Sequence, residues 1–272
     1  TMADMAEDDD VEAALAALPE MTDARIVPIT YVNSSAATKA ITARYGGACC
    51  TSSNVRRVFA WALTGEADGG AGAEKILSIP DQHLARNTAV AMGYSLEDCV
   101  VYDPARPGGG LTAEQVDRAK FLLWKGHCYV HQFFLPEQID KLRREVPGIQ
   151  IIVHPESRHD VVAKADAAGS TEQIIRAIEA AEPGSKWAIG TESNLVERLA
   201  RRRSDCEIRV LSDIPARCQQ MSLIDLPHLL WVLDGLAEGE VPNRITVPEE
   251  DAADARIALE RMLAIPASAP GT

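Results

Sequence analysis

Two polar tripeptides stand directly after apolar segments in distant parts of the chain. They are Tyr31-Val32-Asn33, after residues 26–30, and His154-Pro155-Glu156, after residues 149–153. A histidine and a glutamate at the carboxyl end of a strand are suited to proton transfer, and the proline between them fixes the backbone. The alternative for the second tripeptide is a capping glutamate beside a surface histidine.

Hydroxyl side chains recur after each tripeptide. Ser52 lies in Thr51-Ser52-Ser53-Asn54, and Thr171 lies in Gly169-Ser170-Thr171. Hydroxyls and backbone N–H groups at the start of a helix can bind a carboxylate or a phosphate. Ordinary N-capping is the commoner role of such residues and remains the alternative. Asp81 and Glu192 occupy a further pair of turns and are candidate caps.

Two of the six cysteines stand at matching places. Cys128 follows the first repeated segment and Cys218 follows the second. Cysteines far apart in sequence can converge on one metal or cluster, whereas single free cysteines are commonly small buried hydrophobes. His127 and His131 flank Cys128, either beside a metal or as hydrogen-bonded structural residues.

The other four cysteines are weaker candidates. Cys99 and Cys206 fall in expected strands and are predicted to lie in the core. Cys49 and Cys50 form an adjacent pair, which is poorly placed for shared ligation.

The elements that must position these residues repeat in the same order. The expected strands are 26–30, 75–79, 99–102, 149–153, 186–189 and 206–211. The expected helices are 36–45, 54–63, 83–92, 111–121, 160–168, 172–182, 192–203, 226–237 and 252–263, with a short strand over 241–247. Strands that alternate with helices predict an α/β fold of repeated three-layer αβα domains with parallel sheets. We expect segments 1–127 and 128–217 to be repeat domains and 218–272 to be a C-terminal helical segment.

Composition narrows the class of function. The net charge of −13 argues against nucleic acid or an anionic membrane as the main partner, although it allows a local cationic pocket for a small phosphate. No apolar run approaches the roughly 18 residues of a membrane span, and we expect no signal peptide. Six cysteines are too few for a disulfide framework, so we expect a cytoplasmic protein with reduced thiols.

Eight ordered motifs, spread over essentially the whole chain, give it a specific resemblance to a known family. They are Tyr31-Val32-Asn33-Ser34-Ser35-Ala36, Cys50-Thr51-Ser52-Ser53-Asn54, Pro80-Asp81-Gln82-His83-Leu84-Ala85-Arg86-Asn87, Trp124-Lys125-Gly126-His127-Cys128-Tyr129-Val130-His131, His154-Pro155-Glu156-Ser157, Gly169-Ser170-Thr171, Ile189-Gly190-Thr191-Glu192 and Leu259-Glu260-Arg261-Met262-Leu263. The chain resembles quinolinate synthase, the A protein of de novo NAD synthesis.

The resemblance implies a fold, a cofactor and a reaction. The family has three α/β domains related by pseudo-threefold symmetry around a 4Fe–4S cluster, which three cysteines hold. It is a transferase that condenses iminosuccinate (iminoaspartate) with dihydroxyacetone phosphate to give quinolinate, phosphate and water. A functional link to L-aspartate oxidase or aspartate dehydrogenase is implied as well.

The resemblance also assigns residues. It makes Cys128 and Cys218 two of the cluster ligands and Glu156, Tyr31 and His154 the catalytic residues. The implied substrate-binding residues are Tyr31, Val32, Asn33, Ser52, His154, Pro155, Glu156 and Thr171.

The chain departs from the family pattern in two places. The first cluster cysteine would fall just before Thr1, so we expect two of the three domains, an inactive chain, and a segment 218–272 that would complete the missing N-terminal domain. Ala85 replaces a usual glycine. The alternatives are a non-catalytic α/β remnant that binds a small dicarboxylate or phosphate, and a cluster-free phosphate-binding isomerase or lyase.

Overall fold

Two parallel β-sheets form the framework of the chain. The structure is a computed structural model, and it describes residues 2–265. The first sheet has the order β2-β1-β3-β5-β4, and the second has the order β7-β6-β8-β9. The strands of the first sheet are β1 (Ile26–Tyr31), β2 (Ala48–Cys50), β3 (Lys75–Ile79), β4 (Cys99–Tyr102) and β5 (Phe121–Trp124). Those of the second are β6 (Gln150–Val153), β7 (Ala167–Ala168), β8 (Lys186–Gly190) and β9 (Glu207–Val210). Every pairing is parallel, which confirms the predicted α/β class.

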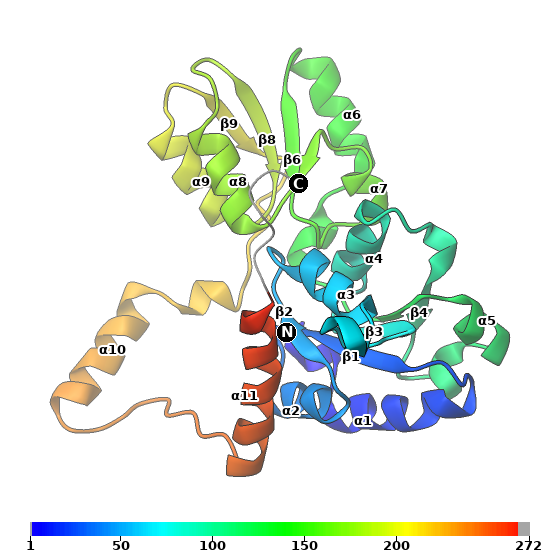
Figure 1. The fold of residues 1–272 in the computed structure, drawn as a ribbon. Helices are drawn as coiled ribbons and strands as arrows, with labels where there is room; N and C mark the ends of the chain where they lie inside the picture. The colour runs from blue at the N-terminus through cyan, green and yellow to red at the C-terminus, as the bar shows by residue number, and fades with distance from the viewer. Residues whose placement is uncertain (1, 266–272) are drawn as a thin grey trace.

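Helices cover both faces of each sheet (Figure 1). Those packed with the first sheet are α1 (Asp8–Ala17), α2 (Ala36–Arg44), α3 (Val55–Leu63), α4 (Gln82–Ala91) and α5 (Ala113–Arg118). Those of the second are α6 (Pro136–Glu145), α7 (His159–Val162), α8 (Thr171–Glu179) and α9 (Ser193–Arg202). In the second sheet, Ile151 faces the α6 side and Ile152 faces the α8–α9 side. This alternation gives the three-layer arrangement, because strands covered on both faces are apolar throughout.

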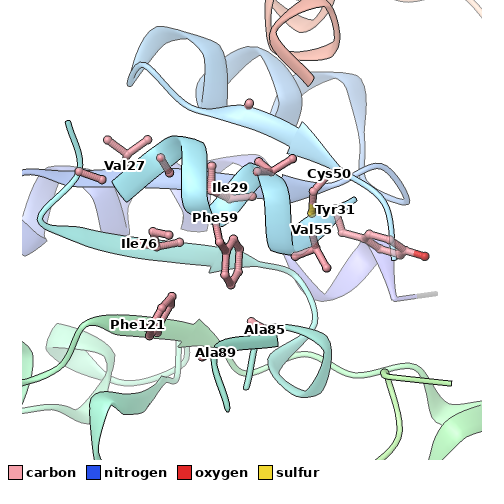
Figure 2. Close-up of a cluster of buried hydrophobic side chains, with 14 of the residues drawn as sticks. Val27, Ile29, Tyr31, Cys50, Val55, Phe59, Ile76, Ala85, Ala89 and Phe121 are labelled. Carbon is pink, nitrogen blue, oxygen red and sulfur yellow. The ribbon is translucent and has the colours of Figure 1, made fainter. Parts of the chain in front are cut away.

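The first core joins β1 and β3 to α3 and α4 (Figure 2). Phe59 stacks on Phe121, with ring centroids 5.5 Å apart, and both rings are fully buried. Loss of one such ring costs about 3–5 kcal/mol in typical cores. Tyr31 lies at the end of this cluster, and its hydroxyl points away from the other labelled side chains (Figure 2). The core therefore presents Tyr31 at the carboxyl edge of the sheet.

The predicted order of elements holds in both halves, with differences at the edges of the sheets and in the tail. Strands β2, β5 and β7 were not predicted, and β5 replaces the end of the helix expected over 111–121. Phe121–Trp124 pairs with both β3 and β4, so four buried apolar residues favour the sheet over the helix. The helix expected over 160–168 ends at Val162, because Asp166 bonds the backbone of Ile151 directly before β7. Segment 241–247 forms no strand.

The tail consists of two helices with different surroundings. Helix α11 (Glu249–Ala264) packs on α2 and β2 through Ala258, and its Arg261 donates to the carbonyls of Ala43 and Gly47. Helix α10 (Leu226–Ala237) lies away from both sheets, and its apolar side chains are largely exposed (Figure 1). The assignment of segment 218–272 to another domain stays a prediction.

No helix within residues 2–265 is both long enough and apolar enough to cross a membrane.

Candidate active site at the carboxyl edges of two sheets

The strand order creates a crevice at the same point in each sheet. From β1 the chain passes outward to β2 and returns to β3 on the other side, and β6, β7 and β8 repeat this path. Ligands of open parallel sheets bind outside the carboxyl ends of the strands where the order reverses. Tyr31 ends β1 and His154 follows β6, so the two predicted tripeptides occupy equivalent reversal points.

One cavity of about 1040 Å³ gathers residues from both sheets. Of the residues to which the resemblance assigns a role, those lining it are Tyr31, Asn33, Cys128, His154, Glu156, Thr171 and Cys218. Its other polar contributors include His131, Thr191 and three arginines. Residues far apart in sequence thus face a single space.

The remaining three predicted residues lie around this cavity rather than on its wall. Ser52 hydrogen-bonds the hydroxyl of Tyr31. Val32 packs against the first core, and its N–H donates to the carbonyl of Cys50 at 2.8 Å. The carbonyl of Pro155 accepts a hydrogen bond from Asn87 at 2.8 Å. These residues support the wall through backbone and hydroxyl contacts.

Glu156 is buried between a histidine and a tyrosine. His131, in the 3-10 helix η6 (Tyr129–Phe133), places its Nδ1 3.1 Å from Oε2 of Glu156. Tyr31 hydrogen-bonds Glu156 from the other sheet. Burial disfavours the carboxylate, but the hydrogen bond from His131 and its positive charge hold the pKa of Glu156 below its usual range. Glu156 is therefore an ionised carboxylate at neutral pH.

Its two partners keep their protons. Burial opposes the charged form of His131, but the thiol of Cys128 and the carboxylate of Glu156 outweigh burial and raise its pKa to about 10. Burial, reinforced by Glu156, raises the pKa of Tyr31 far above its ordinary value. The site at neutral pH therefore holds an imidazolium, a carboxylate and a neutral phenol in contact. Such a set can accept a proton at one atom and donate one at another.

His154 is a neutral imidazole beside this pair. Its ring stacks on that of His131, with centroids 4.6 Å apart and planes 12° apart. Its Nδ1 accepts the N–H of Glu156 at 3.3 Å, which makes Nε2 the protonated nitrogen. Burial, with the neighbouring His131, lowers the pKa of His154 to about 4. His154 can therefore donate a hydrogen bond from Nε2 without carrying charge.

The loops that carry the two predicted cluster cysteines are bonded to each other. The hydroxyl of Tyr129 accepts the N–H of Gln219 at 2.6 Å and donates to Oε1 of Gln220 at 3.0 Å. Tyr129 follows Cys128 and the two glutamines follow Cys218. Both cysteines are half-buried free thiols on the wall of the same cavity. Two soft ligands facing one space are part of the donor set that an iron–sulfur cluster requires.

A third feature agrees with a metal-bearing group near Cys128. Ligand atoms of Cys128, His131 and Glu156 all lie within 4.8 Å of one another. The Nδ1 of His131 is buried and faces Oε2 of Glu156 at 3.1 Å. The residues present thus fit part of the implied cluster site.

The candidate caps prove to hold the cysteine loops. Asp81 caps α4 by accepting the N–H of Leu84 at 2.7 Å, and its other oxygen accepts the N–H of Cys128 at 3.1 Å. Glu192 caps α9 and accepts the N–H of Cys218 at 3.4 Å. Burial, then the charge of Glu156, raises the pKa of Asp81 to about 7. The cap interpretation of both residues is confirmed, and each also reaches a cysteine.

In the two hydroxyl-rich turns, 51–54 and 169–171, the residue that caps the turn or helix is not the one predicted to bind substrate. Ser170, not Thr171, caps α8 by accepting the N–H of Gln173. Thr171 is the first residue of that helix and lines the cavity. Ser52 bonds Tyr31, while Asn54 closes its own turn by accepting the N–H of Thr51 at 2.7 Å.

Sequence reasoning missed the arginines of the wall. Arg198 and Arg201 project from α9, and Arg217 precedes Cys218. Their only advance signal is the spacing of three residues, which places Arg198 and Arg201 on one helix face. In a chain of net charge −13 they form a local cationic rim, which anionic ligands favour.

The other four cysteines lie apart from the wall. Cys49 and Cys50 are buried in β2, where burial raises the pKa of Cys49 to about 11. Cys99 and Cys206 are half-buried rather than central in the core, and Cys206 directly precedes β9.

Comparison with known proteins gives one consistent result. The sequence pattern of a family described as "Quinolinate synthetase A protein" matches residues 1–264. A quinolinate synthase of Streptomyces coelicolor is 52% identical over 270 residues, which are 98% of this chain and 67% of that protein. Those of a Nocardioides species and of Geobacillus kaustophilus are 54% and 49% identical, over 98% and 97% of this chain and 68% and 70% of those proteins. The chain spans about two thirds of the length of these relatives.

Proposed function

This chain belongs to the quinolinate synthetase A family, and we propose that its cavity serves the condensation of iminosuccinate with dihydroxyacetone phosphate to quinolinate, phosphate and water. The relatives are named as an enzyme, which supports the prediction of an enzyme over that of a non-catalytic remnant. The observation that carries the proposal is the buried triad of Glu156, His131 and Tyr31, which meets two thiols at one cavity.

The proposed role of Glu156 is general base. Enamine formation and ring closure need a proton removed from carbon or nitrogen, and an ionised carboxylate inside a cavity can take it. His131 holds the carboxylate in place at 3.1 Å and stabilises its charge. The neutral phenol of Tyr31 can donate a proton, or a hydrogen bond, to a departing or carbonyl oxygen.

Anion binding is proposed for the rest of the wall. Thr171 at the start of α8 offers a hydroxyl and a helix N-terminus to a carboxylate or phosphate. Asn33 and the Nε2 of His154 can orient substrate oxygens, and Ser52 acts through Tyr31. The arginine rim would draw both dianionic substrates toward the cavity.

The proposed cofactor is a 4Fe–4S cluster held in part by Cys128 and Cys218. When bound, it would supply a Lewis acid at one iron for a substrate oxygen or nitrogen. Two thiols line the cavity of this chain, and the resemblance implies three cluster ligands. We therefore expect residues 1–272 alone to hold a cluster poorly and to form little quinolinate.

Anaerobic loading with iron and sulfide tests the cofactor. We expect iron retention by the wild type to fall in Cys128→Ser and Cys218→Ser but not in the matched control Cys206→Ser. Iron retention that is the same in the wild type, Cys128→Ser and Cys218→Ser would exclude these two cysteines as ligands. A stable cluster spectrum with turnover from residues 1–272 alone would overturn the expectation of weak binding.

The substrates imply a neighbouring reaction. Iminosuccinate is an imine that water hydrolyses, so an enzyme that oxidises aspartate, such as L-aspartate oxidase or aspartate dehydrogenase, would have to supply it. We propose a cytoplasmic setting, in keeping with six free thiols.

A further inference from the structure

Asn87 on α4 lies in the contact between the two sheet domains. It is buried, with 6% of its surface exposed, although α4 belongs to the first sheet and its partners belong to the second. Its Nδ2 donates to the carbonyl of Pro155 at 2.8 Å and to the carbonyl of Ser157 at 2.8 Å. These are the two carbonyls on either side of Glu156.

The orientation of the Asn87 amide is fixed by its partners. Two carbonyl oxygens can accept only from the amide nitrogen, so Oδ1 must face the other way. There Oδ1 lies 2.9 Å from Nδ1 of His159, in α7, which must then be the protonated nitrogen. Both hydrogens and the oxygen of the amide are therefore used, and all of its partners belong to the second sheet domain.

The turn that carries Glu156 has few other anchors. His154 donates its N–H to Gly190 at 2.9 Å and extends the pairing of β6 with β8. Ser157 donates back to the carbonyl of His154 at 3.0 Å, and Pro155 has no N–H to give. A buried carbonyl without a donor is unfavourable, so removal of Asn87 would drive the turn to rearrange.

The same helix also fixes the neighbouring thiol. Asp81 caps α4 and holds the N–H of Cys128 at 3.1 Å, while Gln82 donates to the carbonyl of Gly126 at 3.0 Å. One rigid helix thus bonds the Cys128 loop at its first residues and the Glu156 turn at its middle. The separation of thiol and carboxylate follows from the length of α4 between these contacts.

We propose that Asn87 is a positioning residue for Glu156, acting through the carbonyls of Pro155 and Ser157. The inference rests on the proposed function only for the role of Glu156. Asn87 itself does not line the cavity, so its effect is on the placement of the carboxylate against His131 and Tyr31.

The test compares three variants of residues 1–272. Asn87→Asp keeps the size and the acceptor for His159 but removes both donors. Thr88→Val is the matched control, because Thr88 is equally buried on α4 and its hydroxyl donates to the carbonyl of Leu84 in its own helix. His159→Ala removes the group that orients the amide and serves if Asn87→Asp does not fold.

The first readout needs no ligand. In histidine-labelled protein at fixed pH, we expect Asn87→Asp to shift the nitrogen and proton resonances of the His131 ring, because its ion pair with Glu156 loosens. Thr88→Val should leave these resonances in place, and His159→Ala should shift them less. Unchanged His131 resonances in folded Asn87→Asp would overturn the proposal.

The second readout uses quinolinate as the probe. We expect its dissociation constant to rise about tenfold in Asn87→Asp and to stay within about twofold in Thr88→Val, even if both lower the melting temperature equally. An equal rise in both variants would show a merely structural role. If wild type fails to bind quinolinate, the proposed function is contradicted, while the His131 resonances still decide the role of Asn87.

Discussion

The two repeated units share a backbone plan and use it differently. Helices α4 and α9 each begin after an acidic cap that accepts the N–H of a cavity cysteine. Six residues after the cap, α4 carries Asn87, buried against the other domain, whereas α9 carries Arg198, exposed on the cavity wall. The repeat thus provides equivalent positions, and the side chain at each position decides between fixing a neighbouring domain and attracting a charged ligand.

A close backbone approach in the first unit holds the Cys128 loop, and its loss should have the largest effect of the changes considered. A Cβ on Gly126 would lie 2.2 Å from the carbonyl oxygen of Pro80, so Gly126→Ala must displace the Cys128 loop. We expect a loss of about 4 kcal/mol in the free energy of unfolding, measured with urea. Gly65→Ala, where the nearest atom is 3.7 Å away, should cost little. Equal losses would show that the close approach is not required.

A pH series separates two histidines, one from each unit. Burial lowers the pKa of His154 to about 4. Burial, together with the charge of Arg86, lowers the pKa of His83 to about 4 as well. Each unfolded imidazole takes up a proton near pH 6.5, so the stability that each neutral ring contributes is present above pH 6.5 and is lost as the pH falls toward 4.

Between pH 6.5 and pH 4, His154 should account for a loss of about 3 kcal/mol in the free energy of unfolding. The less buried His83 should account for about 1 kcal/mol. The check is the pH dependence of unfolding in His154→Asn and His83→Asn relative to wild type. If His83→Asn reduced the loss of stability at low pH more than His154→Asn did, the order expected for the two histidines would be wrong.

The two acidic caps give the next contrast. Asp81 is 2% exposed and bonds its cysteine at 3.1 Å, whereas Glu192 is 8% exposed and bonds at 3.4 Å. Asp81→Ala should therefore cost about 2 kcal/mol and Glu192→Ala about 1 kcal/mol. Alkylation by iodoacetamide, followed by mass spectrometry, should quicken at Cys128 in the first variant and at Cys218 in the second. If either variant increased the alkylation rate of both Cys128 and Cys218, the effect of each cap would not be confined to its own cysteine.

The smallest effect concerns charge at the cavity mouth. Arg198→Gln should weaken quinolinate binding about threefold at low salt and less at high salt, because an exposed charge is screened. Arg202→Gln is the control, since Arg202 pairs with Glu179 and does not line the cavity. A salt-independent effect would point to a direct bond instead of attraction at a distance.

Much of this arrangement could be predicted from sequence, and the rest depends on distant contacts. The apolar segments before the two polar tripeptides predicted strands β1 and β6 and the positions of Tyr31 and His154 after them, because strand patterns and turn residues are local signals. Strand β5 and the partners of Asn87 carried no such signal. Four apolar residues fit a helix end as well as a buried strand, and the role of Asn87 exists only once the second domain packs against α4. His131 was noted beside Cys128, but its pairing with Glu156 joins elements that no spacing relates.

The central claim is that one ligand meets both repeated units in one cavity. Calorimetric titration of residues 1–272 with quinolinate tests it most directly, using Tyr31→Phe from the first unit and Thr171→Val from the second, with Tyr45→Phe and Thr64→Val as exposed controls. We predict one site per chain, weakened about tenfold by each cavity variant and unchanged in both controls. Binding that responds to only one of the two cavity variants, or to neither, would contradict a shared site.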